Sequence, residues 1–525
     1  MHSTSLTDIV ALARAGAIDR ALREYEAGGF GSAPDPAAQT VRARLLKDLA
    51  KQRAGDERRR LYREAAEAYR WAFEMRPGSY PLINAATLSL LAGDVERSRT
   101  LAGEVLVRIE EEPNEPETPY WRSATAAEAL LLLGRKSEAG AALAEAVAVA
   151  PRAWEDHAST LRQFALILAA QGGDPSWLDT YRPPRSLHFG GHMSFDSRVV
   201  RRDLDQTIAA ILEEERIGFG YGALAAGADI LIAEALVARG AELHVVLPGS
   251  LEAFASHSVG PFGGTWRRRF DALIEKAETV HTGRPGGVLP GPQTIAVADE
   301  VAMGAAAMNA LRLESEAVQL LVIDGGGLTN GRASARARAI WAGSERRQRL
   351  LKAPREAIDA LEVPGSTNET RVRSMAIIAI FTAQTGEDEA LEGELRALRQ
   401  AIAESPDPLV APYWTGERVL LAHERLELAA ELTQALAQKG YRVGADYVAA
   451  ANLVDAFSGS VRLGPSASGA AEAAASSTPI GSACVTAEFA AALAARGRSN
   501  IRAELVGELE SRDGGAPIAL YALKR

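Results

Sequence analysis

The first third of the chain, from Ser5 to about Gly173, has a helical pattern, because apolar residues recur at three- and four-residue spacing. Ser5 and Asp8 resemble a capping box ahead of the first helix. The loops between the expected helices are short and contain glycines that favour turns, such as Gly93 and Gly134. After the first helix, this pattern predicts helices at about 37–52, 57–75, 80–92, 95–111, 121–133, 136–149 and 153–171.

These helices have the period of a helical-repeat solenoid. Helix pairs with small residues at contact positions and a turn about every 34 residues are typical of TPR-like repeats. Segments 69–77 and 141–151 look alike, since each ends a helix in a proline and precedes another helix. Stacked pairs of this kind leave a concave protein-binding surface. We therefore expect a TPR-like helical domain over residues 1–175, which either recruits a partner or packs as a scaffold on its neighbour.

Part of this region also resembles a known partner-binding domain. Residues 69–73 and then 79–88 (Ser-Tyr-Pro-Leu-Ile-Asn-Ala-Ala-Thr-Leu) are similar to the TRAFs-binding helical domain of apoptosis-signal-regulating MAP kinase kinase kinases. The resemblance implies a protein partner for the helical repeats and no catalytic residues.

Between Ser186 and Pro248 the pattern changes to short apolar runs that end in glycine and alternate with amphipathic segments. This alternation predicts β-α-β units with parallel strands. Further apolar runs at 278–282 and 318–324 complete a predicted five-stranded parallel sheet with helices on both faces. We place this α/β domain at residues 176–330.

Four glycines mark the ends of two of these strands. Ligands of open parallel sheets bind beyond the carboxyl ends of the strands. A residue without a Cβ lets a ligand approach the backbone, and the following helix N-terminus offers free N–H groups to an anion. The alternative is that the glycines form ordinary tight β-α turns. The spacing is not the dinucleotide GxGxxG fingerprint, and the chain has no GxxxxGK[ST] phosphate loop.

The same stretch resembles the SLOG superfamily, the Rossmann-like group that contains the LOG cytokinin-activating enzymes, DprA and sensor domains of prokaryotic defence and signalling systems. The resemblance covers about 186–327 and rests on 220–223 (Gly-Tyr-Gly-Ala), 227–229 (Gly-Ala-Asp), Glu234 and the strand that ends Val-Val-Leu-Pro. The enzymes of that superfamily carry a PGGxGTxxE signature. This chain instead has Gly222, Ala223, Gly227, Asp229 and Glu234 in a looser arrangement. The resemblance therefore implies binding of a nucleotide-derived small molecule more than hydrolysis. The ligand-binding residues that we predict are Gly190, Gly191, His192, Gly220, Tyr221, Gly222, Ala223, Asp229, Glu234 and Pro248.

The polar residues of this region do not form a recognisable catalytic or metal motif. His188 and His192 lie at a strand end without an HExxH motif or a His/Cys cluster, so we expect structural or ligand-bonding roles and no metal. Asp229 fits a helix N-terminal charge, a base or an acceptor for a sugar hydroxyl. Glu234 is five residues further and displaced on the helix surface, which gives a paired-carboxylate mechanism little support. We predict no catalytic residue.

Residues 331–368 are dense in arginine and lysine. We expect a basic helical linker that is solvated. The alternative is a basic strip that packs on acidic helices elsewhere, and nucleic-acid binding is the least favoured interpretation.

From Arg371 the pattern changes to α+β. Expected strands lie at 375–381, in a hairpin over 410–423 broken at Gly416, and at 442–450, 460–463, 501–505 and 517–523, with helices at 387–404 and 426–438. This order, with Trp414-Thr415-Gly416-Glu417 in the hairpin and the terminal run 518–523, resembles the class III nucleotidyl cyclase homology domain. We therefore expect a ferredoxin-like α+β domain over 369–525.

The chain departs from the cyclase pattern at the positions that carry catalysis. Such cyclases hold two Mg²⁺ ions between a first-strand Asp and a hairpin Asp, yet 374–386 contain no acidic residue and Glu417 stands in the hairpin. Tyr413 takes the place of the base-selecting lysine, and Ser468 and Glu472 fall near the Asn and Arg positions. A carboxylate where negative charge accumulates opposes catalysis. We expect a degenerate domain without a metal cofactor, which serves head-to-tail homodimerisation or regulation.

Composition limits the classes of protein that fit. A chain of 525 residues is too long for one core and suggests two to four domains. The net charge of −10 argues against nucleic-acid or anionic-membrane binding. One cysteine, Cys484, fits a reducing cytoplasm. The amino end lacks a signal pattern, and no apolar run approaches the roughly 18 residues of a membrane span, so we expect a cytoplasmic protein.

Three functions follow from these patterns. The first is a non-catalytic signalling protein that binds a nucleotide-derived ligand, recruits a partner through its helical arm and dimerises through its last domain. The second is an enzyme that cleaves a nucleotide or its N-glycosidic bond, with Asp229 or Glu234 as the acid–base group. The third is a purely structural assembly protein.

Overall fold

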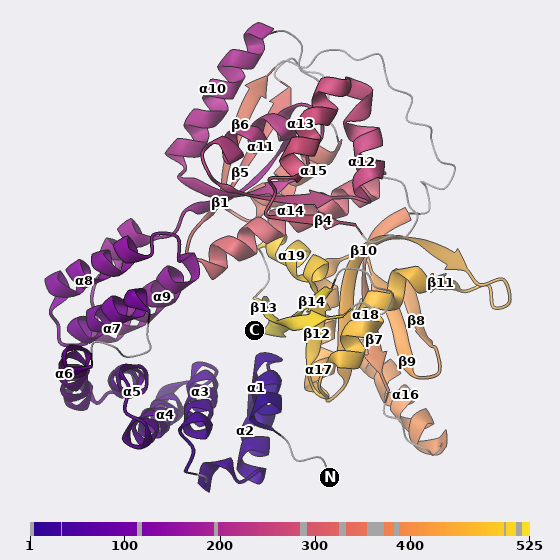
Figure 1. Ribbon diagram of the computed structural model, residues 1–525. Coiled ribbons are helices and arrows are strands. Elements are labelled where there is room, and N and C mark those ends of the chain that lie inside the picture. The colour runs from indigo at the N-terminus through magenta and orange to yellow at the C-terminus, as the bar shows by residue number, and fades with distance from the viewer. Residues whose placement is uncertain are drawn as a thin grey trace. The chain divides into compact units, whose positions relative to one another are not determined.

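The computed structural model describes residues 5–32, 34–112, 118–193, 198–283, 291–324, 332–353, 372–382, 388–406, 408–497, 500–510 and 517–524 (Figure 1). The chain divides into two compact units, Met1–Pro183 with Arg312–Glu314, and Pro184–Leu311 with Ser315–Arg525. No helix within the described ranges is long and apolar enough to cross a membrane.

The first unit is helical, as the pattern predicts. Its first helix begins at a true capping box, in which the Ser5 side chain accepts from the Asp8 amide and the Asp8 carboxylate accepts from the Ser5 amide at 2.9 Å. The predicted helices all form, and a second short helix that the pattern missed follows the first. The helices are α1 (Leu6–Arg14), α2 (Ile18–Ala27), α3 (Pro36–Lys51), α4 (Gly55–Met75), α5 (Ser79–Leu91), α6 (Val95–Glu111), α7 (Pro119–Leu132), α8 (Lys136–Val149) and α9 (Trp154–Gln171).

Neighbouring helices of this unit pair as the repeat prediction requires. Helix α3 packs on α4, α5 on α6 and α7 on α8, while the alternate helices α5, α7 and α9 also contact one another. A continuous apolar core, with Leu46, Tyr69, Leu82 and Phe164 among its buried members, runs through these pairs. Each pair covers the apolar face of the next, which is how a solenoid builds a core.

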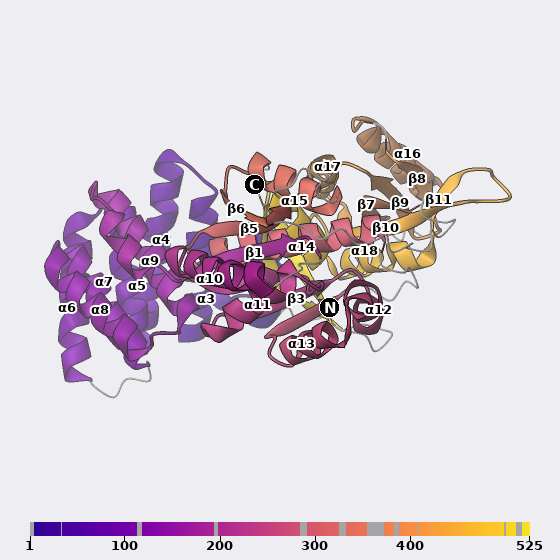
Figure 2. The ribbon, with the colours of Figure 1, turned by 90° about the horizontal axis from the view of Figure 1, so that it is seen from above.

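The second unit contains two sheets. The first is six-stranded and entirely parallel, in the order β4-β3-β2-β1-β5-β6. Helices α11 and α13 lie on one side of its strands and α15 on the other (Figure 2). The strands are β1 (Arg185–Gly191), β2 (Ile217–Gly222), β3 (Glu242–Leu247), β4 (Thr279–Thr282), β5 (Ala317–Asp324) and β6 (Arg347–Ala353). The helices are α10 (Arg198–Glu214), α11 (Ala228–Ala238), α12 (Leu251–Ser258), α13 (Gly264–Ile274), α14 (Pro292–Arg312) and α15 (Arg332–Gly343).

The prediction of five strands and a solvated helical linker is wrong for residues 347–353, because strand β6 lies in that stretch and pairs with β5. Its arginines explain the error. Arg347 and Arg349 donate at 3.0 Å to the fully buried carboxylate of Glu215, which Arg185 also contacts at 2.9 Å. The alternative interpretation, a basic strip that packs on an acidic helix, therefore describes these two residues.

The second sheet runs β13-β14-β12-β10-β7-β9-β8, with β11 paired to β10, and every pair except β10–β12 is antiparallel. Its strands are β7 (Val372–Phe381), β8 (Val410–Trp414), β9 (Arg418–His423), β10 (Arg442–Val454), β11 (Val461–Leu463), β12 (Ala483–Thr486), β13 (Arg502–Leu509) and β14 (Ile518–Lys524). Its helices are α16 (Asp388–Ala403), α17 (Leu426–Gln438), α18 (Pro465–Ser477) and α19 (Ala487–Arg496).

Strand β7 is the centre of this sheet. Ala376, Ile378 and Ile380 pack with α16, α17 and α19 on one face, while residues 375, 377 and 379 pack with α18 on the other. Both faces are thus covered, which is why β7 is a continuous apolar run. The pattern predicts β7, the hairpin β8–β9 and α17, but it misses α18, β12 and α19, whose alanine-rich sequences carry little periodicity.

The two sheets are joined by close contact between α14 and α19. A Cβ added at Gly304 would collide with the backbone of Ala491, so the two helices approach as closely as their main chains allow. Small buried residues on both helices, including Ala298 and Ala302, surround this contact. Beside it, the buried carboxylate of Glu300 binds Arg336 of α15 and Arg496 of α19.

We predict that Gly304→Ala lowers the free energy of unfolding of the second unit by about 2–3 kcal/mol, because the new methyl group meets main chain that cannot move aside. The measurement is urea denaturation. The same substitution at Gly393, where a Cβ meets nothing within 4 Å, is the control and should be neutral or stabilising by up to about 1 kcal/mol. Equal effects at the two positions would contradict the close contact.

A second prediction concerns Glu215. We expect Glu215→Gln to cost about 2–4 kcal/mol of unfolding free energy, because three arginines then converge on a buried neutral amide. Glu213→Gln is the matched control, since its side chain is 82% exposed and pairs with Arg239 alone, and it should cost under about 0.5 kcal/mol. Denaturation midpoints that shift by the same amount in both variants would exclude the Glu215 cluster as a stabilising element.

Candidate functional site

The topology of the parallel sheet fixes where a ligand would bind. From β1 the chain proceeds outward through β2, β3 and β4, then returns to the other side of β1 to form β5 and β6. The order therefore reverses between β1 and β5, and the crevice of such a sheet lies beyond the carboxyl ends of these two strands. Gly191 and Asp324 end them. The segments 194–197, 284–290, 325–331 and 354–371, which follow β1, β4, β5 and β6, are outside the described residues.

Three of the predicted glycines serve packing within the protein. A Cβ at Gly222 would lie 2.7 Å from the Phe189 carbonyl oxygen, and one at Gly191 would lie 2.5 Å from the Ala228 methyl group. A Cβ at Gly220 would collide with Leu236 of α11. Close packing against a neighbouring strand or helix, rather than a ligand, thus accounts for the lack of a side chain at these three positions.

Gly190 differs from the other three. It is partly exposed, and a Cβ there would make an ordinary contact of 3.6 Å with Leu321. The next atom it would meet is a carboxylate oxygen of Asp229, at 4.0 Å. At this strand end Gly190, Gly191 and His192 are all partly exposed. The Gly191 amide bonds the Asp229 carboxyl group, and the His192 amide donates to the Val322 carbonyl oxygen at 3.2 Å.

Asp229 stands in the first turn of α11, directly after Gly227, whose φ of 115° favours glycine. Its carboxyl group accepts a hydrogen bond from the Ala225 amide at 3.1 Å. Burial raises the pKa of Asp229 to about 8; the nearby Asp299 adds to this, and bonds from the amides of Ala225, Gly191 and Asp229 itself oppose it. A carboxyl group that is largely protonated at pH 7 therefore lies at the strand end, among the amides where the sequence predicted an anion.

A buried polar chain leads away from this carboxyl group. His188, wholly buried in β1, contacts the Asp299 carboxylate through Nε2 at 3.0 Å and the Gln319 amide through Nδ1 at 3.0 Å. Trp341 stacks on its ring, and Gln348 donates to Gln319. The Asp299 side chain is 27% exposed, so it is the accessible end of this chain. No pattern in the sequence pointed to Asp299, because it lies on α14 at no motif spacing from β1.

The structure separates several other predicted residues from this place. Glu234 forms a bidentate ion pair with Arg269, with one bond of 2.6 Å, on the side of α11 that faces α13. It lines a different cavity, of about 460 Å³. Tyr221 stacks on His244 at 4.5 Å within the sheet, and burial raises its pKa. Glu234 and Tyr221 are therefore not brought together with Asp229.

The remaining predicted residues have local roles. His192 contacts the Ala353 carbonyl oxygen at 3.0 Å through Nε2, which ties the end of β1 to the end of β6. Pro248 is buried, and its carbonyl oxygen lies 2.9 Å from the position of a Cβ on Gly283. Ala223 is partly buried in the loop before α11. Over the described part of the chain, no group of three or more His, Cys, Asp or Glu side chains could hold a metal ion.

In the second sheet, the residues compared above with cyclase catalytic positions lie in a local hydrogen-bond network. Arg418 pairs with Glu472, which also accepts from the Ser468 hydroxyl at 2.5 Å. Glu417 lies 3.3 Å from the same guanidinium. The Tyr413 hydroxyl accepts from the Leu463 amide at 3.2 Å. Both carboxylates therefore contact the one guanidinium of Arg418, while Tyr413 bonds the backbone.

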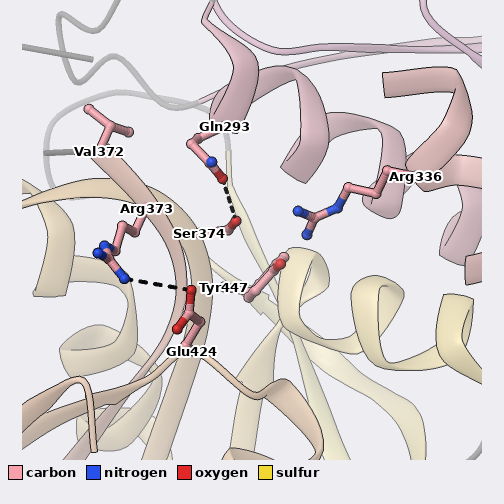
Figure 3. A pocket seen from close by; sticks show the side chains of 7 residues that line it. All are labelled: Gln293, Arg336, Val372, Arg373, Ser374, Glu424 and Tyr447. Atoms are coloured by element: carbon pink, nitrogen blue, oxygen red, sulfur yellow. Dashed lines mark hydrogen bonds and ion pairs between the residues drawn. The ribbon is translucent and has the colours of Figure 1, made fainter. Parts of the chain in front are cut away.

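A polar cavity of about 420 Å³ lies where the two sheets meet. Figure 3 shows Gln293 and Ser374, which hydrogen bond at 2.9 Å, and Arg373 and Glu424, which pair at 3.8 Å. Arg336 and Tyr447 close it on the side of Glu300. No single segment could have revealed this cavity, because its lining comes from α14, α15, β7, β10 and Glu424, the residue after β9.

Comparison with known proteins identifies part of the helical unit. A family model described as TPR-S, Tetratricopeptide Repeats-Sensor, matches residues 7–89. It confirms the prediction of TPR-like repeats for residues 7–89. No curated protein matches the chain.

Solved structures are similar to parts of the chain at low identity. An adenylate/guanylate cyclase/hydrolase from Silicibacter pomeroyi is 16% identical and covers 29% of this chain and 98% of its own, with a TM-score of 0.24. The adenylyl cyclase CyaB from P. aeruginosa is 12% identical over 29% of this chain and 96% of its own, also at 0.24. An O-GlcNAc transferase mutant from Thermobaculum terrenum is 13% identical over 61% of this chain and 76% of its own, at 0.17.

The raised pKa of Asp229 makes a prediction about stability. Between the ordinary value of 3.8 and about 8, the folded chain keeps a proton that the unfolded chain releases. Stability contributed by this group therefore falls as pH rises through that window, by up to about 1.4 kcal/mol per pH unit. The Asp229→Asn variant has no ionisable group at this position. The unfolding free energy of the variant, relative to that of the wild type, should therefore rise from pH 5 to pH 8. Urea denaturation curves that stay parallel over this range would contradict the buried, protonated carboxyl group.

Proposed function

We propose that this chain is a non-catalytic signalling or regulatory protein that binds a nucleotide-derived small molecule at the carboxyl ends of β1 and β5. The TPR-S match at 7–89 supports a regulatory role at a coarse level. The ligand site is supported chiefly by one observation, the reversal of strand order between β1 and β5 next to the partly exposed residues 190–192.

The electrostatics of this strand end support a phosphate-bearing ligand. The Asp229 carboxyl group, with its pKa of about 8, carries little negative charge at pH 7. A phosphate near Gly190 would thus meet the first turn of α11 without strong repulsion from this side chain. Above pH 8 the ionised carboxylate would repel the same ligand.

The other parts of the protein have complementary roles in this proposal. The helical unit recruits a protein partner, and the second sheet, in which Glu417 and Glu472 both contact Arg418, serves homodimerisation without a metal cofactor. The domain boundaries at about 175 and 368, the resemblance to the SLOG superfamily and the cytoplasmic location belong to the proposal as well.

A second candidate function is hydrolysis of a nucleotide or of its N-glycosidic bond. It is favoured by the influence of Asp299, which bonds His188, on the raised pKa of Asp229. A protonated carboxyl group can act as a general acid. In this version Asp299 replaces Glu234, which is held by Arg269.

The experiment uses the full chain with NAD and the four nucleoside monophosphates as probes. We expect saturable binding by calorimetry for at least one probe, weakening as pH rises from 7 to 9. Gly190→Leu should lower the affinity at least tenfold by filling the strand end, whereas the matched Gly190→Ala should keep it, because its Cβ makes an ordinary contact.

Chromatography of the same mixtures distinguishes the two functions. Binding without release of a free base supports the sensor, while turnover that Asp229→Asn abolishes supports the hydrolase. Binding that Gly190→Leu leaves intact would reject the site, and the absence of both binding and turnover would favour an assembly protein.

A further inference from the structure

A second cavity of the second unit, of about 810 Å³, shares no lining residue with the strand-end site. Helices α14 and α19 line it, together with the segments just before β5 and β6 and the start of β13. Its volume is in the range of small-molecule sites, roughly 300–1,000 Å³. The larger part of its apolar lining consists of Met308, Leu311, Leu493, Ala494, Ile501 and Ala503.

This lining suits an aliphatic group. Leu311 is 56% exposed, so the apolar lining continues from the buried Leu493 and Ile501 to the surface. Among the described residues that line the cavity, none is aromatic. Nucleobases typically stack on aromatic side chains. The cavity therefore fits an aliphatic chain better than a nucleotide.

One arginine of the lining makes no ion pair with any described residue. Arg346 lies between α15 and β6, and its guanidinium donates to the carbonyl oxygens of Ala495 at 3.0 Å and Ala494 at 2.8 Å. Burial lowers the pKa of Arg346. The two bonds satisfy carbonyl groups at the end of α19, a common role for a cation at a helix C-terminus. They leave other N–H groups of the guanidinium available to a carboxylate, its best-matched partner.

The guanidinium is held in place on several sides. It lies 5.5 Å from the centre of the ring of Trp341, which is fully buried. Gly497 ends α19 with a φ of 63°, and a Cβ there would lie 2.9 Å from the Ser344 Cβ and 3.4 Å from Nη2 of Arg346. A side chain already ordered in this way loses little conformational entropy when it binds an anion.

The other charges of the lining are paired or offset. Arg347 and Glu316 each form an ion pair with a residue outside the lining. Glu345 and Arg502 are both exposed and have opposite signs. The cavity therefore combines an apolar lining with an excess positive charge at Arg346. Capping of α19 explains the two carbonyl bonds of Arg346, but it does not explain an open apolar cavity beside that charge.

We propose that this cavity is a second ligand site, which binds a free medium-chain fatty acid. Its carboxylate would bind Arg346, and its aliphatic chain would lie along Met308, Leu493 and Ile501. Because α14 belongs to the parallel-sheet half and α19 and β13 to the second-sheet half, the ligand would contact both halves. This inference goes beyond the proposed function and does not depend on the β1–β5 site.

The test is calorimetry of the full chain with decanoate, kept below the concentration at which it forms micelles. We expect saturable binding of one decanoate per chain. Decanol, which keeps the chain but lacks the charge, should bind about tenfold more weakly or worse. Decyltrimethylammonium, with the opposite charge, should not bind.

Three variants assign the two ends of the ligand. Arg346→Gln should lower the affinity for decanoate about tenfold or more and leave that for decanol within about twofold, whereas Arg346→Lys, which keeps the charge, should bind decanoate only severalfold more weakly. Ala503→Leu should weaken both compounds by filling the apolar part of the cavity. Arg396→Gln is the control, because Arg396 is 75% exposed on α16 and pairs with Glu392, and it should bind as the wild type does.

Urea denaturation provides a readout that also detects misfolding. Decanoate should raise the midpoint of the wild type, because a ligand that binds only the folded state stabilises it, and should leave that of Arg346→Gln unchanged. This variant should keep the nucleotide binding of the wild type, which separates the two sites. The proposal is overturned if decanol binds as tightly as decanoate, if Arg346→Gln or Ala503→Leu binds decanoate unchanged, if Arg396→Gln loses as much affinity, or if the wild type does not bind decanoate.

Discussion

The arrangement of the second unit depends on the bonds that the buried carboxylate of Glu300 makes to its partners. It is 1% exposed on α14, and it binds Arg336 of α15, Arg496 of α19 at 2.6 Å and the Tyr447 hydroxyl of β10 at 3.2 Å. A buried carboxylate is tolerable only when such partners replace its water. Because the partners come from both halves, the parallel sheet and the second sheet satisfy one charge together.

This constraint also relates the candidate ligand site to the second sheet. Asp299, which bonds His188 beneath the strand end, precedes Glu300 on the same helix. One turn further, Gly304 brings α14 against the main chain of α19. Asp299 and the close contact with α19 therefore lie on one helix, α14, within two turns of each other.

The glycines show how the same residue type can support two physical explanations. A glycine at a strand end permits a ligand to approach, and it equally permits a helix or a neighbouring strand to approach. Phe189, Ala228 and Leu236 fill the space beside Gly222, Gly191 and Gly220, so the second explanation holds there. Only the neighbours of each glycine could decide between the two, and these neighbours come from elements distant in the sequence.

The sequence by itself determined the features that depend on near neighbours along the chain. The capping box at Ser5, the helix over 426–438 and the hairpin turn at Gly416 follow from local periodicity and turn chemistry. Tertiary structure alone decided that 347–353 form a strand, that Glu215 gathers three arginines, and that Asp299 stands beside Asp229 while Glu234 does not. The sequence around a charged residue does not identify its ion-pair partner, because the fold can bring that partner close from any part of the chain.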